Sequence, residues 1–144
     1  MQNITQVLNK KNWEVILKSN NNKFISYVNN SSTYTKYIPQ HLQRMLIKNF
    51  SEKYKYKLQN EFLEYNNMSH LPVLLSLISK KKQKNIIIFS IHSLSVNRKI
   101  VKKIFQLALK NKKNFFFANE ELSTLNKKEF KLIKKITSHK SFIN

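Results

Sequence analysis

The chain has no glycine, no cysteine and no aspartate among its 144 residues, and it has only two prolines. The lack of cysteine excludes disulfide bonds and thiolate metal sites. The lack of glycine excludes phosphate loops of the Walker and Rossmann types, because the backbone of those loops requires residues without a Cβ. No apolar run reaches the roughly 18–20 residues that cross a bilayer, since the longest runs lie at 71–78 and 86–91. The chain is therefore not expected to be a transmembrane protein.

Negative charge is scarce as well. Seven Asp+Glu residues stand against 27 Lys+Arg residues, which gives a formal net charge of +20. Between Lys80 and Asn119 there is no acidic residue. A solvated surface normally mixes charges of both signs, and repulsion among like charges opposes the compact state. The imbalance therefore predicts a polyanionic partner, of which nucleic acid is the commonest.

The abundant residue types point to a biased genome. Lysine supplies 25 of the 27 positive charges, and Asn, Ile, Phe and Tyr are plentiful, whereas Ala, Pro and Arg occur twice each. AT-rich codons encode the abundant set and GC-rich codons the scarce one. This composition favours a chain encoded in an organelle and located in the mitochondrion, which would need no presequence. A plastid or an AT-rich nuclear genome is the alternative.

The first half of the chain has the pattern of helices and loops. A helix is predicted at 4–18, and a polar loop at 19–37 is interrupted by a short strand at 23–28. A long helix is then predicted from Pro39 to the Asn pair at 66–67, because apolar residues recur every four positions. Gln43 falls on the polar face of that helix. Residues 1–70 are accordingly predicted to form a mainly helical N-terminal extension.

The second half alternates strands with one helix. Strands are predicted at 71–79, 85–92, 114–118 and 129–136, and a helix at 96–111. In the last of these strands Phe130 and Leu132 alternate with lysines, and Ser93 or Ser95 is the expected N-cap of the helix.

A strand–helix–strand unit normally gives parallel neighbours joined by a right-handed crossover. Residues 71–144 are therefore predicted to form a small α/β RNA-binding domain with a partial ferredoxin-like (split βαβ) sheet, and the whole chain is of the α+β class. The incomplete sheet would be completed by the strand at 71–79 or by another chain.

Several segments of this half occur in the order of a known family. They are a strand at 86–90 before a turn with His92, a Val-Lys-Lys-Ile tetrad at 101–104, a Phe-Phe-Phe strand at 115–117, and a loop and strand from 122 to 134. In these segments the chain resembles small-subunit ribosomal protein ten, in a divergent mitochondrial type. The resemblance covers only 86–141, and the family's second helix and fourth strand have no counterpart.

The resemblance implies a structural constituent of a mitochondrial small ribosomal subunit. Its expected partners are ribosomal RNA and neighbouring ribosomal proteins, with the loop at 119–128 reaching into the RNA. Lysines at loops and element ends suit sequence-independent phosphate contacts, although solvated charge is the ordinary alternative. The predicted RNA-binding residues are Lys80, Lys81, Lys82, Lys84, Arg98, Lys110, Lys112, Lys113, Lys127, Lys128, Lys131, Lys134, Lys135 and His139.

No residue pattern predicts an enzyme. The four histidines are widely spaced, so neither a metal nor a cofactor is expected, and no small-molecule substrate is expected either. Glu61 and Glu64, at helical i, i+3 spacing, are the residues on which a nucleic-acid enzyme would have to depend, and surface helix charge is their ordinary interpretation. The main alternative function is a basic accessory subunit of an inner-membrane respiratory complex, with residues 71–91 on the membrane and the lysines facing anionic lipid.

Overall fold

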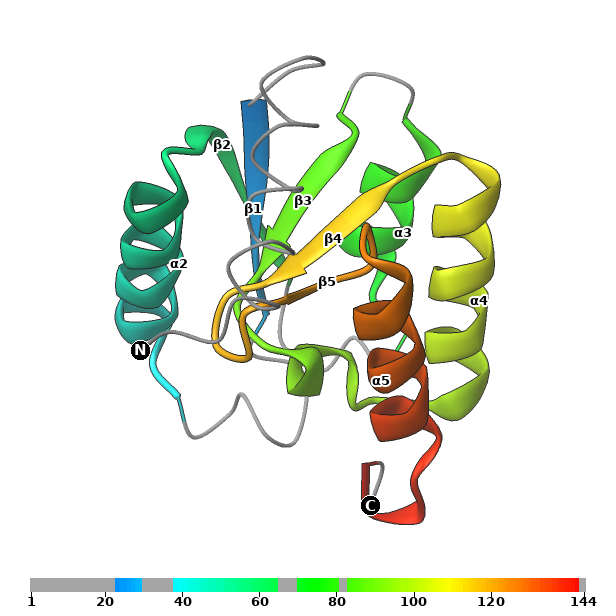
Figure 1. Ribbon diagram of the computed structural model, residues 1–144. Coiled ribbons are helices and arrows are strands. Elements are labelled where there is room, and N and C mark those ends of the chain that lie inside the picture. The colour runs from blue at the N-terminus through cyan, green and yellow to red at the C-terminus, as the bar shows by residue number, and fades with distance from the viewer. Residues whose placement is uncertain (1–22, 30–37, 65–69, 81–82, 143–144) are drawn as a thin grey trace.

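A five-stranded sheet with the strand order β2-β1-β3-β4-β5 forms the centre of the protein. The computed structural model describes residues 23–29, 38–64, 70–80 and 83–142, and Figure 1 shows helices on both faces of the sheet. The first four strands are parallel to their neighbours, and β5 is antiparallel to β4. The strands are β1 (Lys23–Asn29), β2 (Lys57–Glu64), β3 (Asn85–Ile88), β4 (Asn114–Phe117) and β5 (Leu122–Ser123).

Two apolar clusters hold the helices against the sheet. Phe24, Ile87 and Phe116 face α2 (Gln40–Tyr54). Their neighbours Ile86 and Phe115 face the opposite layer of α3 (Pro72–Ser79), α4 (Arg98–Lys110) and α5 (Lys127–Ser138). Because parallel strands are covered on both faces, β3 and β4 are continuous apolar runs, without the alternation of a strand that has one wet face.

The predicted strand–helix–strand crossover is confirmed. β3 pairs with β4 in parallel, and α4 lies between them in the chain. A short 3-10 helix, η2 (Ile91–Leu94), follows β3, and α4 begins after Asn97, whose side chain accepts a hydrogen bond from the amide of Lys99. Asn97, and not Ser93 or Ser95, is therefore the N-cap.

The mixed α and β character of the chain is confirmed, but the predicted ferredoxin-like sheet is wrong. β1 and β2 come from the half expected to be a helical extension, and they pair in one sheet with β3. Neither the segment at 71–79 nor another chain completes the sheet, because β1 occupies the place beside β3. The helix expected at 4–18 lies outside the described residues. The division of the chain at residues 70 and 71 stays a prediction.

The long helix predicted from Pro39 ends much earlier. Pro39 is the N-cap of α2, and Lys55 ends the helix in the left-handed conformation, with φ 58°. The apolar spacing of four that predicted a longer helix also fits a strand, because residues four apart share a face at a period of two. The segment after Tyr56 is β2, the exposed edge strand of the sheet.

Two predicted strands are helices. The segment at 71–79 is α3, where Pro72 takes the first helical position and presets the backbone angle that a helix requires. The segment at 129–136 belongs to α5, whose N-cap Asn126 accepts hydrogen bonds from the amides of Lys128 and Glu129. In both segments the apolar pattern fits a strand as well as a helix. The residue that starts the helix, Pro72 in α3 and Asn126 in α5, favours the helix.

Candidate functional site

The carboxyl ends of β1 and β3 lie at the point where the sheet changes its winding direction. After β1 the chain passes to α2 on one face, and after β3 it passes to α4 on the other. In open α/β sheets, ligands bind outside the carboxyl ends of the strands at this switch point. The polar residues here are Asn29, Gln43, Ser90, Ser93 and Glu120, which we call the switch-point cluster.

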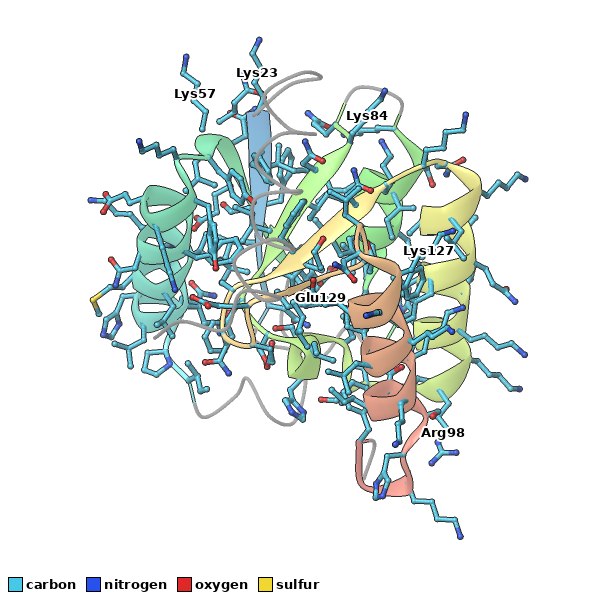
Figure 2. The ribbon with its side chains drawn as sticks, in the orientation of Figure 1. Lys23, Lys57, Lys84, Arg98, Lys127 and Glu129 are labelled. Atoms are coloured by element: carbon cyan, nitrogen blue, oxygen red, sulfur yellow. The ribbon has the colours of Figure 1, made fainter. Side chains whose placement is uncertain are left out.

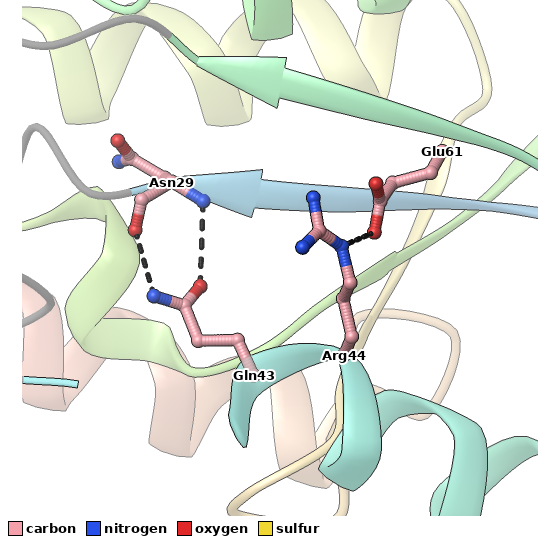
Figure 3. Close-up of polar contacts among 4 residues, drawn as sticks. All are labelled: Asn29, Gln43, Arg44 and Glu61. Atoms are coloured by element: carbon pink, nitrogen blue, oxygen red, sulfur yellow. Dashed lines mark hydrogen bonds and ion pairs between the residues drawn. The ribbon is translucent and has the colours of Figure 1, made fainter. Parts of the chain in front are cut away.

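Asn29 joins the two central strands through a buried amide. Its Nδ2 donates to the carbonyl oxygen of Ser93 at 2.6 Å, so the end of β1 is fastened to η2. Gln43 of α2 holds the backbone of the same residue. Its Oε1 accepts from the Asn29 amide at 3.4 Å, and its Nε2 donates to the Asn29 carbonyl at 3.2 Å (Figure 3). Both residues are fully buried, so the position of Asn29 is fixed from α2 and from η2.

Ser90 and Glu120 form the second part of the cluster. The hydroxyl of Ser90 donates to Glu120 Oε2 at 2.6 Å, and the amide of Ile91 donates to Oε1 at 2.9 Å. The amide of His92 in turn donates to the Ser90 hydroxyl at 3.1 Å. This carboxylate therefore fixes the turn that begins η2, and it connects the ends of β3 and β4.

Ser93 is the exception within the cluster. Its side chain is fully buried, and its Oγ has no hydrogen-bond partner among the described residues. Leaving a buried hydroxyl unsatisfied costs about 1–3 kcal/mol. The hydroxyl of Ser93 is therefore the one buried side-chain group of the cluster that has no partner among the described residues.

Both arginines of the chain stand near this end of the sheet. Arg44 lies in the second turn of α2, and Arg98 is the first residue of α4. Arg44 Nε donates to Glu61 Oε1 at 2.6 Å (Figure 3), and this hydrogen bond raises the pKa of Arg44. Arg98 projects from the end of the molecule opposite to Lys23, Lys57 and Lys84 (Figure 2). Guanidinium groups can bind phosphate with two parallel hydrogen bonds.

A groove between α4 and α5 adjoins Arg98. Its volume is about 410 Å³, and its lining includes the apolar residues Val101, Phe105 and Leu109 and the cation of Lys134. Lys134 Nζ lies 4.6 Å from the centre of the Phe130 ring, so this ammonium group already has an aromatic partner.

The sequence-predicted RNA-binding residues do not form one surface. One group lies near the amino ends of β3 and β4, and the other lies on α4 and α5 or at the end of α5; Lys81 and Lys82 fall outside the described residues. The first group consists of Lys80, Lys84, Lys110, Lys112 and Lys113, and the second of Arg98, Lys127, Lys128, Lys131, Lys134, Lys135 and His139. Their contact with nucleic acid stays a prediction.

Lys113 differs from the rest of its group because it is buried. Its Nζ donates to the carbonyl oxygens of Lys80 and Gln83. Burial lowers the pKa of Lys113, and the charge of Lys84 lowers it further. Lys113 therefore holds the loop before β3, and its ammonium group is not presented to a ligand.

Glu61 and Glu64 do not form the catalytic pair that helical spacing allowed. They lie on strand β2, where residues three apart point to opposite faces. Glu61 pairs with Arg44, whereas Glu64 is buried and accepts from the hydroxyl of Tyr27. Within the described part of the chain there is no group of three or more potential metal ligands, and none of the described helices is long and apolar enough to cross a membrane.

The parallel sheet with helices on both faces and the order 2-1-3-4-5 places the protein among the doubly wound α/β folds. Two solved structures share this particular arrangement. One is the N-terminal catalytic domain of TP901-1 integrase, with a TM-score of 0.63 and 15% identity over 83% of this chain and 95% of that one. The other is a resolvase family site-specific recombinase from Streptococcus pneumoniae, with a TM-score of 0.59 and 13% identity over 79% and 84%. No protein-family model and no curated protein sequence matches the chain.

These likenesses overturn the functional predictions made from the sequence. The neighbours in structure are an integrase catalytic domain and a site-specific recombinase, and not ribosomal protein ten. The predicted ribosomal role, with ribosomal RNA and ribosomal proteins as partners, is wrong, and so is the respiratory-complex alternative. The prediction that the chain is not an enzyme is contradicted as well, because the integrase domain that shares its fold is a catalytic domain. The local matches to the ribosomal family arose from a βαβ unit that many α/β folds share.

Sequence reasoning missed the switch-point cluster. The strands at 23–28 and 85–92 were both predicted; the structure confirms the first as β1 and the second in its first half, as β3 at Asn85–Ile88, before η2. Their pairing was not predicted, and only this pairing brings Asn29 to Ser93. A signal was present in the polar residues that directly follow each apolar strand, since parallel strands bring their carboxyl ends to one edge.

Proposed function

We propose that the chain acts on DNA as an enzyme that cleaves and rejoins strands, since its structural neighbours are an integrase catalytic domain and a site-specific recombinase. The observation that carries the proposal is the likeness to the integrase catalytic domain, which extends over 95% of that domain. The net charge of +20 supports it independently, because DNA is a polyanion.

Rejoining of DNA strands without an external energy source requires that the energy of the phosphodiester be kept. A protein hydroxyl that attacks the phosphorus meets this requirement. The serine oxygen forms a new ester bond to phosphorus, a DNA hydroxyl leaves and takes up a proton, and the reverse attack by a DNA hydroxyl releases the serine. Such a reaction consumes no cofactor.

The chain offers hydroxyl groups for this role at the switch point. Ser93 is the described candidate, because its Oγ has no partner among the described residues, whereas Ser90 already donates to Glu120. Since Ser93 is fully buried, its attack requires that the phosphate reach a covered hydroxyl. Ser31 and Ser32 follow Asn29 closely in the sequence and lie outside the described residues, so they are candidates on sequence order alone. Arg44 and Arg98 would supply positive charge to the phosphate in the transition state.

Trapping of a covalent protein–DNA ester tests the proposal. The protein is incubated with a random-sequence duplex library and denatured in detergent, and the DNA that remains attached is sequenced. We expect attached DNA with the unaltered chain and with Ser138→Ala, a control at the end of α5. One of S31A, S32A or S93A should abolish attachment and leave equilibrium binding of the duplex unchanged. A folded protein that binds the library and attaches to none of it would refute the proposal.

We further propose that the mitochondrial location predicted from composition holds for this DNA-acting protein. The AT-type residue bias supports it, because the bias concerns the gene and not the fold. Fractionation of cells that produce the chain tests it, and recovery outside purified mitochondria would contradict it.

A further inference from the structure

The amino ends of four neighbouring strands carry one lysine each, in register. Lys23 of β1 is directly paired with Lys57 of β2. Ile25 of β1 pairs with Ile86 of β3, so the same register places Lys84 beside Lys23. Asn85 pairs with Asn114 of β4, so Lys113 follows beside Lys84. We call Lys57, Lys23, Lys84 and Lys113 the amino-edge row.

The row concentrates positive charge at one end of the molecule. Neighbouring strands are about 4.8 Å apart, so the first three lysines span about 10 Å. All three are exposed, and Figure 2 shows them projecting from the same end of the sheet. Like charges placed opposite each other on adjacent strands destabilise a sheet. A polyanion at this edge would offset that repulsion.

Few carboxylates offset it within the described chain. Glu120 and Glu121 follow β4 at the far end of the sheet, and Glu129 lies in the first turn of α5. Glu61 on β2 and Glu52 in the last turn of α2 are the acidic residues nearest in sequence to the row. Glu61 pairs with Arg44, and Lys53 directly follows Glu52. The charge along the sheet therefore changes from positive at the amino ends of the strands, where the lysines lie, to negative at the carboxyl ends, where the carboxylates lie.

The fourth lysine supports the others. Lys113 is buried and donates to the carbonyl oxygens of Lys80 and Gln83, which fixes the backbone on both sides of the loop before Lys84. Lys80 and Lys112, both exposed, border this loop and extend the charged surface beyond the row. Lys113 therefore fixes the backbone at Lys80 and at Gln83, the residue next to Lys84.

We infer that the three exposed lysines of the amino-edge row, Lys57, Lys23 and Lys84, bind the phosphate backbone of duplex DNA, at the end of the sheet opposite to the switch-point cluster. One strand of a duplex presents a charge every 3.4 Å or so along the axis, so an edge about 10 Å long faces about three phosphates. Lysines act there as point charges, which suits contact independent of base sequence. The choice of DNA as the polyanion rests on the proposed function. This surface holds the DNA and takes no part in strand cleavage.

The two ends of the sheet act independently of each other. β1 has 7 residues, so the row lies about 20 Å from the end of the strand at roughly 3.3 Å per residue. That distance exceeds the Debye length of about 8 Å at physiological ionic strength. A DNA segment at the row is therefore screened from the charges of the switch-point cluster.

The salt dependence of DNA binding tests the inference. The variant K23Q/K57Q/K84Q is compared with the unaltered chain by fluorescence anisotropy on a random-sequence duplex, between about 50 and 200 mM KCl. The slope of log Kobs against log salt should decrease by about 2.7, because each lost phosphate contact removes about 0.9. The matched control is K48Q/K99Q/K103Q, which removes the same charge from exposed positions on α2 and α4 and should leave the slope almost unchanged.

Equal slopes for the two triple variants would overturn the inference, because net charge and not the row would then set the affinity. Preferential loss of binding to phosphatidylserine vesicles, with the DNA slope unchanged, would also overturn it in favour of a membrane surface. Circular dichroism checks that the variants are folded. The single variant K84Q is a smaller change and should lower the slope by about 0.9. The triple variant could show the reduced slope while the unaltered chain forms no covalent DNA ester. In that case the row binds DNA, and only the proposed strand cleavage is refuted.

Discussion

Glu64 connects three parts of the fold through one buried carboxylate. Its Oε1 accepts from the hydroxyl of Tyr27 at 2.8 Å and from the amide of Leu74 at 3.2 Å, and its Oε2 accepts from the amide of Val73 at 3.1 Å. Amides in the first turn of a helix have no partner inside the helix. Glu64 therefore caps α3 and fastens it to β2 and β1.

Replacing Glu64 with Gln should destabilise the protein by about 1.5–3 kcal/mol, because the amide keeps the shape but turns one acceptor into a donor that faces other donors. The free energy of unfolding in urea measures the change. The matched control is Glu61→Gln on the same strand, which breaks an exposed pair with Arg44 and should cost less than about 1 kcal/mol. Equal losses for the two variants would show that Glu64 does not cap α3.

Ionisation of Tyr27 should lower the stability of the protein at alkaline pH. Burial raises the pKa of its hydroxyl well above the ordinary value, and the charge of Glu64 and the hydrogen bond to it raise it further. The folded chain therefore keeps a proton that the unfolded chain loses above about pH 10. Since the folded pKa is the higher one, this stabilisation is complete below pH 10 and is lost as the pH rises above it.

The variant Tyr27→Phe should be less stable than the unaltered chain at neutral pH, by about 1–3 kcal/mol, because Glu64 loses a donor. Above pH 10 the difference should shrink by at most about 1.4 kcal/mol per pH unit. Urea unfolding at pH 8, 10 and 11 or so checks both parts of the prediction. A difference that stays constant across this range would mean that Tyr27 ionises equally in both states.

Gln43 illustrates what the sequence cannot indicate at the scale of a residue. The helix containing it was predicted, and its amide was placed on the polar face, yet the side chain is fully buried. Its environment follows from two hydrogen bonds to the backbone of Asn29, a residue 14 positions earlier. Helical periodicity cannot distinguish a polar residue that faces water from one that binds a neighbouring strand.

At the scale of elements, the strands with the most distinctive composition were predicted correctly. β3 and β4 are short runs of Ile and Phe flanked by lysine and asparagine, and both are fully covered by helices. The elements that failed were short apolar segments in which periods of two and 3.6 both fit. For α5 the N-cap Asn126 and the half-buried Phe130 were the available signals for a helix.

The strand predicted at 129–136 and the observed helix α5 bury different side chains. In the predicted strand Leu132 shares the inner face with Phe130. In α5 Leu132 is 45% exposed, whereas Ile133 is fully buried. Ile133→Ala should therefore lower the free energy of unfolding by about 2–5 kcal/mol. Leu132→Ala should change it by less than about 0.5 kcal/mol.

Thermal or urea unfolding of the two variants measures these costs. Both substitutions place alanine at a helical position, so helix propensity is matched apart from the small difference between Ile and Leu. The reverse order of destabilisation would restore the strand. A similar small loss for both would mean that α5 does not pack on the sheet.

At the scale of the whole molecule, the site depends on strand order. Asn29 and Ser93 are 64 positions apart, and they meet because β1 lies between β2 and β3. The sequence indicated most of the strands that carry the site, but it did not indicate which strands are neighbours. Pairing between distant segments is decided by burial of both sheet faces at once, for which no local pattern gives a signal.

The charge of the whole molecule should make its stability rise with salt. With a net charge of +20, mutual repulsion opposes the compact state, and salt shortens the Debye length from about 30 Å at 0.01 M to about 10 Å at 0.1 M. We expect the urea midpoint to rise over this range of KCl. The rise should be smaller for K23Q/K57Q/K84Q, because that variant removes three like charges from adjacent strands. Attractive pairs such as Lys53–Glu121 respond in the opposite sense, so a midpoint that falls with salt would mean that such pairs outweigh the repulsion along the amino-edge row.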